Sequence, residues 1–189
     1  MAALDGLLLS PAEVSTAMGA TAMAVAAGHS EMFDESAHIP DRACLPAYGP
    51  GQLLVYIGSG YTATRNEELK EPDEKFDHFV VQAVVAFPTA ADAGAFFNAS
   101  TQSWVGCSNR QYIHTLDGQP AHSWVVGAVS NNNGTLSLQK TQQGANGWGC
   151  ERALTVRNNV AVDIMACATP PGDAGLSIAH PIAAKVGPD

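Results

Sequence analysis

The stretch from Cys150 to Cys167, CERALTVRNNVAVDIMAC, decides the fold because it predicts a β-hairpin that begins and ends with a cysteine. Two apolar runs flank Asn158-Asn159, and asparagine tolerates the positive φ angles of a tight type I′ turn. Residues of such a hairpin pair symmetrically about the turn. Cys150 lies eight residues before Asn158 and Cys167 eight residues after Asn159, so the two cysteines face each other.

The alternation of pair types along this hairpin favours a Cys150–Cys167 disulfide. Arg157 and Val160 close the turn as a hydrogen-bonded pair, and counting outward makes the two cysteines a non-hydrogen-bonded pair. The Cα atoms of such a pair lie about 4.5 Å apart, at the short end of the disulfide range. The chain has four cysteines, so a Cys44–Cys107 disulfide follows by elimination. The alternative is two or more free buried thiols.

The cysteines also indicate a cellular compartment. None of them belongs to a C-x-x-C pair, which removes the spacing typical of zinc sites and of thioredoxin-like sites. Disulfides persist outside the reducing cytosol. Residues 1–10 hold one short apolar run without a basic flank, unlike a signal peptide, and no run approaches the ~20 residues of a membrane helix. We therefore expect an extracytoplasmic domain of the cell envelope, tethered to the membrane by a protein or lipid anchor outside this chain.

Length and composition predict one globular domain spanning residues 1–189, since 46% of the residues are hydrophobic and 14% are charged. The formal net charge is −9, and the nine Lys and Arg residues are scattered along the chain. Nucleic acids and anionic lipid headgroups both require a basic face. The composition therefore excludes nucleic acid as a partner and disfavours adhesion to anionic membranes.

The fold class is predicted as α+β, with a central antiparallel sheet that carries helices on both faces. The strand Phe76–Phe87 is apolar on both sides, which is typical of a strand covered on both faces. Thr89 caps a following helix whose stripe includes Phe97 and Trp104. The other expected elements are a helix starting at Ser10 and stopping at Gly19, a loop-rich region at Gly28–Gly51, a strand or short turn at Leu53–Ile57, an extended stretch at Tyr61–Arg65, a solvated loop at Glu67–Asp77, strands at Gln111–Leu116, Ser123–Val129 and Leu136–Thr141, and a helix near Gly175–Val186 that Pro181 is expected to interrupt.

Several motifs together resemble one known family, the PknH-like extracellular domain of mycobacteria. The motifs are LDGLLLSPAEV (Leu4–Val14), YIGSGYTA (Tyr56–Ala63), QAVVAFP (Gln82–Pro88), GWGCERAL (Gly147–Leu154), and NNVAVD (Asn158–Asp163) with the following Ala166-Cys167. The resemblance spans nearly the whole chain. It implies the external sensor domain of a receptor Ser/Thr kinase, or a stand-alone lipoprotein domain, with two disulfides and a large cleft for an unidentified ligand. The chain carries no kinase motif.

Six residues are candidates for ligand binding in such a cleft: Tyr61, Arg65, Gln82, Trp148, Arg152 and Asp163. In the predicted hairpin Arg152 and Asp163 lie diagonally on one face. They form either an ion pair that closes the sheet edge or a polar cleft wall for a charged or sugar-like ligand. Gln82 is an amide within an apolar strand and must find a hydrogen-bonding partner. Tyr61 and Trp148 are either stacking platforms or core residues.

Catalytic and metal-binding patterns are weak in this sequence. The six histidines show no i, i+4 pair, Gly58-Ser59-Gly60 has no surrounding phosphate-loop fingerprint, and no G-x-S-x-G motif occurs. We therefore expect no catalytic residues, metal or cofactor. The first hypothesis is a non-enzymatic sensor that binds an unidentified small molecule or cell-envelope component. The alternatives are an envelope hydrolase that uses Asp163 and a lipoprotein domain that binds a protein partner through an exposed apolar patch.

Overall fold

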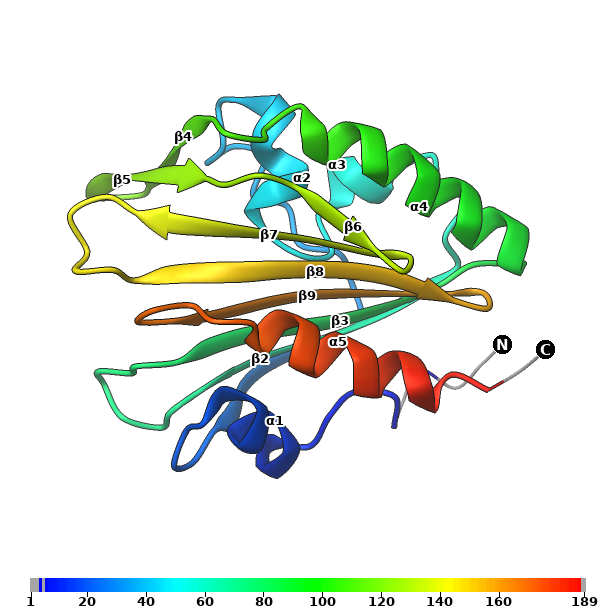
Figure 1. Ribbon diagram of the computed structural model, residues 1–189, viewed down its shortest axis with the longest axis horizontal. Coiled ribbons are helices and arrows are strands. Elements are labelled where there is room, and N and C mark those ends of the chain that lie inside the picture. Colours follow the sequence, from blue (N-terminus) through cyan, green and yellow to red (C-terminus); the bar gives the residue numbers. More distant parts are fainter. Residues whose placement is uncertain (1–3, 5, 188–189) are drawn as a thin grey trace.

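The computed structural model describes Leu4 and residues 6–187, and within this range nine strands form one antiparallel sheet (Figure 1). The strand order is β1-β2-β3-β9-β8-β7-β5-β4, and β6 pairs with β7 beside this path. The strands are β1 (Ala24–His29), β2 (Ala63–Lys70), β3 (Phe79–Ala86), β4 (Gln111–Leu116), β5 (Gln119–Val126), β6 (Ser130–Asn132), β7 (Thr135–Gln142), β8 (Gly149–Arg157) and β9 (Val160–Ala168).

Helices cover both faces of the sheet, as the apolar pattern of β3 predicts (Figure 1). The helical elements are α1 (Pro11–Met18), the 3-10 turn η1 (Arg42–Cys44), α2 (Leu45–Tyr48), α3 (Leu53–Tyr56), α4 (Ala90–Val105) and α5 (Ala174–Lys185). One face of the sheet is covered by α4, α2 and α3, and we call it the α4 face. The opposite face of the sheet is covered by α5 and α1, and we call it the α5 face. The α+β class with helices on both faces is thus confirmed.

Each face has its own hydrophobic core. On the α4 face, Trp104 and Phe96 of α4 pack with Tyr56 of α3 and with sheet residues such as Val85. On the α5 face, the core of sheet residues is closed by Ile178 and Ile182 of α5, by α1 and by the N-terminal segment. In α4 the buried aromatic residue of the helical stripe is Phe96 rather than the predicted Phe97, which is only partly buried.

The β8–β9 hairpin has the predicted register. Its pairs run from Arg157↔Val160 at the turn to Cys150↔Cys167 near the open end. Both predicted disulfides are present, with Cα–Cα distances of 4.8 Å for Cys44–Cys107 and 3.9 Å for Cys150–Cys167. Because β8 and β9 lie in the middle of the strand order, the second disulfide sits within the sheet and not at its edge.

The edge strand β1 was not predicted, and the loop expected at Glu67–Asp77 is wrong over its first four residues. Those four residues continue β2, where Leu69 is fully buried between β1 and β3. The charged run is compatible with a strand because β2 lies next to the edge of the sheet, and its Glu68 carboxylate lies 3.7 Å from His29 of β1. The solvated loop begins only after Lys70.

The expected interruption of the last helix by Pro181 is also wrong, because α5 continues through that residue. Proline removes one N–H bond to the carbonyl four residues earlier, here that of Ser177. Both residues lie on the exposed side of α5, so water can bond to the freed carbonyl. The buried side chains Ile178 and Ile182 hold the helix against the sheet.

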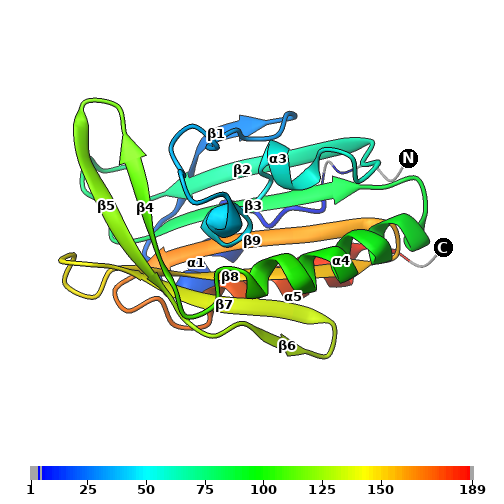
Figure 2. The same ribbon diagram turned by 90° about the horizontal axis from the view of Figure 1, so that it is seen from above.

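Two segments that pack on the sheet contribute residues to the candidate site. The undecided segment Leu53–Ile57 contains the short helix α3, and the loop-rich region Gly28–Gly51 contains η1 and α2. The β4–β5 hairpin turns away from the direction of the other strands (Figure 2). Over the residues described, no helix combines the length and apolar character needed to cross a membrane.

Candidate functional site

Arg152 and Asp163 form a buried ion pair on the α4 face. Their side chains lie 2.8 Å apart, and the residues are 1% and 3% exposed. The other Asp163 oxygen accepts bonds from the Tyr56 hydroxyl (3.0 Å) and the Gly51 N–H (3.1 Å). Arg152 also donates to the carbonyls of Ile164 (2.6 Å) and Pro46 (3.2 Å). The pair therefore fixes the α2–α3 segment onto the centre of the sheet instead of closing a sheet edge.

Tyr56 stays protonated in this network. Burial, and next the adjacent Asp163 carboxylate, raise the pKa of the Tyr56 phenol well above its usual value. The neutral hydroxyl is therefore the donor that a buried carboxylate needs. The Tyr56 ring stacks on Phe96 of α4 with 4.3 Å between ring centroids. The network thus links the sheet, α3 and α4.

Gln82 lies on the opposite face, where its amide binds the N-terminal segment. The side-chain oxygen accepts from the Leu9 N–H (3.0 Å), and the side-chain nitrogen donates to the Leu9 carbonyl (2.9 Å) and to Glu67 (3.2 Å). This arrangement gives Gln82 the partner that its position in an apolar strand requires. It also attaches the start of the chain to the central strand β3.

The three remaining candidates are partly buried and lie apart from one another. Tyr61 packs edge-on to Tyr56, Trp148 packs edge-on to Phe76, and Arg65 lies 3.9 Å from Glu67 on β2. The six candidates therefore do not line one cleft. Arg152, Asp163 and Gln82 are enclosed and have almost no surface to offer a ligand. A ligand-binding role for the six stays a prediction.

A concave surface of about 730 Å³ lies as a groove between α4 and the segment from η1 to Gly58-Ser59. We call it the α4 groove, and Figure 2 shows α3 and α4 side by side. Its lining residues are Arg42, Leu45, Pro46, Leu54, Val55, Ile57, Gly58, Ser59, Asp92, Ala95, Phe96, Ala99, Ser100 and Ser103. Sequence reasoning missed most of this groove. The small residues Ala95, Ala99 and Ser103 follow each other at four-residue spacing and were the available signal.

The α4 groove is mainly apolar with a few polar groups. Leu54 and Ile57 are 47% and 63% exposed and give the groove an accessible apolar surface. The Ser59 hydroxyl is buried without a hydrogen-bonding partner among the described residues. Arg42 lies towards the C-terminal end of α4, next to the disulfide, and Asp92 lies in the first helical turn.

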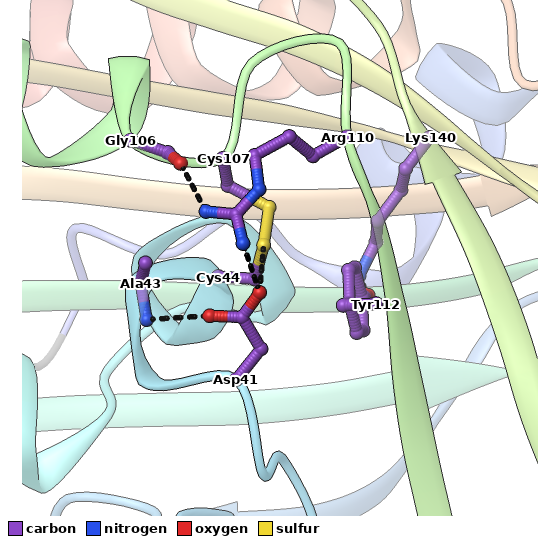
Figure 3. Close-up of a disulfide and its surroundings, with 8 residues drawn as sticks. All are labelled: Asp41, Ala43, Cys44, Gly106, Cys107, Arg110, Tyr112 and Lys140. Carbon is purple, nitrogen blue, oxygen red and sulfur yellow. Dashed lines mark hydrogen bonds and ion pairs between the residues drawn. A yellow bond between two sulfur atoms is a disulfide. The ribbon is translucent and has the colours of Figure 1, made fainter.

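One end of the groove is fixed by covalent and ionic links (Figure 3). The Cys44–Cys107 disulfide joins the end of η1 to the residues after α4. Beside it, Arg110 donates to Asp41 (2.5 Å) and to the Gly106 carbonyl (2.6 Å). The two walls are therefore held at a set separation even though short helices build one of them. Such preorganisation is typical of a binding groove.

A buried lysine behind the α2 helix was also missed. The Lys140 ammonium donates to the Tyr48 carbonyl and to the Tyr112 hydroxyl (3.1 Å), and it lies 4.8 Å from the ring centre of Trp124. Burial lowers the pKa of Lys140 well below its usual value. The sequence held a signal, because Lys140 follows Leu136 and Leu138 on the inward side of β7. Its contacts connect the β4–β5 hairpin with α2.

Two disulfides and an antiparallel sheet between helical layers define an extracytoplasmic α+β domain. Comparison with known proteins identifies the family of this domain. A family model described as the PknH-like extracellular domain matches residues 1–185. The chain belongs to this family.

Relatives and a solved structure agree with this assignment. The Ser/Thr-protein kinase PknH of Mycobacterium tuberculosis is 37% identical over 164 residues, which cover 87% of this chain and 26% of the kinase. PknH of Mycobacterium bovis gives the same identity over 27% of its length. The crystal structure of the extracellular domain of PknH from Mycobacterium tuberculosis is similar at 35% identity, with a TM-score of 0.89 over 95% of this chain and 92% of that chain. The chain thus spans about a quarter of the length of these kinases.

The family assignment answers the question of catalysis. The match is to the extracellular domain of PknH and not to its kinase domain, so the domain itself is a non-catalytic, extracytoplasmic domain. The alternative of a hydrolase that uses Asp163 is therefore wrong, and the geometry gives a physical reason. The Asp163 carboxylate is held by Arg152, Tyr56 and the Gly51 N–H, away from solvent. Among the described residues no cluster of His, Cys, Asp and Glu is arranged to hold a metal ion.

Proposed function

We propose that this domain is a sensor that binds an elongated, mainly apolar small molecule or cell-envelope component in the α4 groove. The observation that carries the proposal is the groove itself. Its volume of about 730 Å³ lies within the range of roughly 300–1,000 Å³ usual for ligand pockets. Leu54 and Ile57 offer apolar contact, and the unpartnered Ser59 hydroxyl offers one directional hydrogen bond.

The polar residues at the groove ends favour an amphipathic ligand. Arg42 and Asp92 lie at opposite ends of a mostly apolar surface, so a ligand with polar termini satisfies both regions. An apolar chain gains roughly 25 cal/mol per Å² of buried apolar surface, and polar ends fix its orientation. Three of the six residues predicted from the sequence support the groove indirectly in this proposal. Arg152 and Asp163 position its α2–α3 wall, and Tyr61 packs against Tyr56 behind it.

The test is to fill the groove without disturbing the fold. Ala99 is an exposed groove residue of α4, and its neighbour Asn98 is exposed on the same helix outside the groove. Ala99→Trp should abolish retention of envelope-extract molecules on the immobilised domain and reduce the fluorescence of bound anilinonaphthalene sulfonate. Asn98→Trp should leave both signals unchanged. Equal retention by both variants in mass spectrometry would place the ligand elsewhere.

We further infer that the full-length protein is membrane-tethered and transmits occupancy of the groove. The named relatives that support this are Ser/Thr-protein kinases in which the matching region is about a quarter of the chain. A stand-alone lipoprotein that binds a ligand or a protein partner is the alternative arrangement. The sequence of the parent gene distinguishes them, since a kinase with a membrane helix defines a receptor and a lipid-modified cysteine defines a lipoprotein.

A further inference from the structure

A second concave site lies on the other face of the molecule. It has a volume of about 590 Å³ and lies between α5, the β6–β7 turn and the end of β8. We call it the α5 pocket. Figure 1 shows the β6–β7 turn and the C-terminal half of α5 at the same end of the sheet. Its lining residues are Asn132, Asn133, Gly134, Thr135, Ser137, Thr155, Val156, Arg157, Leu176, His180, Ala183, Ala184 and Val186.

The floor of the α5 pocket is lined by hydroxyl-bearing side chains of β7 and β8. Thr135 of β7 lies directly opposite Thr155 of β8, and Ser137 is the next pocket residue along β7. The Thr155 hydroxyl donates to the Gly134 carbonyl (2.9 Å). Thr135 is only 6% exposed, and its hydroxyl has no hydrogen-bonding partner within residues 4 and 6–187. A nearly buried hydroxyl that lines a pocket without a partner is available to a ligand.

The charge of the α5 pocket is opposite to that of the chain. Arg157 is exposed, and its guanidinium makes no ion pair with any described residue. His180 stands on the facing side of α5. The chain has eighteen Asp and Glu residues, yet none of them lines this pocket. The α4 groove contains Asp92, and two further concave sites contain two glutamates each.

We propose that the α5 pocket binds a polyol phosphate, a small ligand that joins a phosphate group to several hydroxyls. Arg157 is suited to the phosphate because a guanidinium donates two parallel bonds to its oxygens. The Thr135 and Ser137 hydroxyls and the Asn132 and Asn133 amides are suited to hydroxyls, since each donates or accepts. Ala183 and Ala184 of α5 have small side chains, so they leave room for the ligand in the pocket. This site is independent of the α4 groove, which lies on the opposite face.

The experiment uses glucose 6-phosphate, glucose and inorganic phosphate as probes in calorimetric and ¹⁵N NMR titrations of the domain. We expect glucose 6-phosphate to bind more tightly than either fragment and to shift the amide signals of β7, β8 and α5. Arg157→Ala should weaken its binding about tenfold or more, since it removes charge-assisted hydrogen bonds. Lys75→Ala, which removes an exposed cation on a distant loop, is the matched control and should change nothing.

Thr135→Val separates a ligand role from a structural one. Because the hydroxyl has no partner inside the protein, its removal should leave the unfolding midpoint unchanged or slightly raised, while glucose 6-phosphate binding falls several-fold. Equal binding of inorganic phosphate and glucose 6-phosphate, both unaffected by Thr135→Val, would overturn the polyol part of the proposal. Absence of titratable shifts, or shifts unaffected by Arg157→Ala, would overturn the site.

Flotation with phosphatidylcholine vesicles that contain phosphatidylinositol distinguishes the two sources of this chemistry. If the domain floats with the vesicles and Arg157→Ala abolishes this flotation, the ligand is a lipid headgroup. If the domain binds glucose 6-phosphate but does not float with the vesicles, the ligand is a free polyol phosphate. Both results support the proposed recognition. Flotation that Arg157→Ala leaves intact and that Lys75→Ala abolishes would count against it, because binding would then follow general surface charge.

Discussion

The two faces of the sheet are covered in different ways. On the α5 face, one twelve-residue helix and the N-terminal segment close a continuous apolar core, and Gln82 is a buried polar exception. On the α4 face, the cover includes helices of only four residues, α2 and α3. These short helices are attached by a disulfide, by the Arg152–Asp163 pair and by Lys140. Short helices bury little apolar area, so directional links must hold them, and a groove with fixed walls results.

The largest loss of stability is expected from a substitution of Asp163, which holds the short helices on the α4 face. Asp163→Asn should destabilise the domain by about 3–5 kcal/mol, because it leaves the buried Arg152 guanidinium without a counter-charge. Urea unfolding measures this loss. The double variant Arg152→Met with Asp163→Leu is the control and should recover much of the stability, since a buried pair replaced by apolar residues is often neutral. An Asp163→Asn loss below 1 kcal/mol would contradict the assigned role.

A second prediction compares the two disulfides. The chain-entropy relation gives about 4 kcal/mol for Cys44–Cys107 and about 3 kcal/mol for Cys150–Cys167, whose sequence separations are 63 and 17. The strand ladder already holds Cys150 and Cys167 together. Paired Cys→Ala variants should therefore show the larger loss of stability for Cys44–Cys107. Only that variant should be cut by protease between Gly28 and Gly51 and should lose retention of extract molecules.

Denaturant melts and limited proteolysis of both variants decide this comparison. An equal or greater loss on removing Cys150–Cys167, together with no cleavage in the other variant, would show that the α4 face does not depend on its long-range link. Cleavage without loss of retention would show that the η1–α2 wall is dispensable for binding.

The sequence predicted local pairings well and distant pairings poorly. The β8–β9 register follows from symmetry about two asparagines, and the two-faced apolar pattern of β3 predicts its two helical layers. The hydrogen-bonding partners of Asp163 could not be predicted from the sequence, because Gly51 and Tyr56 lie 112 and 107 residues away in the chain. No pattern in a single sequence fixes such a contact. A polar residue on an inward position indicated that a partner exists, as for Gln82, without identifying it.

The missed strand has a different explanation. Ala24–His29 (AVAAGH) has small residues and is exposed or half-buried throughout, so it lacks the alternation that identifies a half-buried strand. A register shift between Val25 and Ala27 weakens the pattern further. The α4 groove was missed because its walls come from both sides of a disulfide, so it exists only after η1–α3 has packed beside α4.

A third, smaller effect is expected on the α5 face. Gln82→Leu leaves the Leu9 N–H and carbonyl without partners and should cost about 1–3 kcal/mol. Gln82→Glu keeps an acceptor for the Leu9 N–H but buries a second carboxylate beside Glu67, so it should cost at least as much. Amide hydrogen exchange should show faster exchange at Leu9 and in α1 with little change in α4. Equal acceleration in both helices would mean that the two faces are not separate in stability.

The smallest predicted effect concerns pH and the α4 face. Burial lowers the pKa of His114 on β4 from 6.5 to about 4. Glu35 opposes this shift, and the neighbouring Lys140, His122 and His38 add to it. The His114 ring packs against Tyr48 of α2 at 4.9 Å.

The sign of the pH effect follows from proton uptake by the unfolded chain. With the folded pKa below the unfolded one, the unfolded state binds more protons between pH 6.5 and about 4. Stability is therefore complete above pH 6.5 and is lost as the pH falls through that window. Since His114 is half exposed, solvent screening reduces the effect to about 1 kcal/mol. Urea melts of the wild-type domain and of His114→Gln at pH 7 and pH 4.5 should differ in slope against pH. An unchanged slope in the variant would assign the acid sensitivity to other groups.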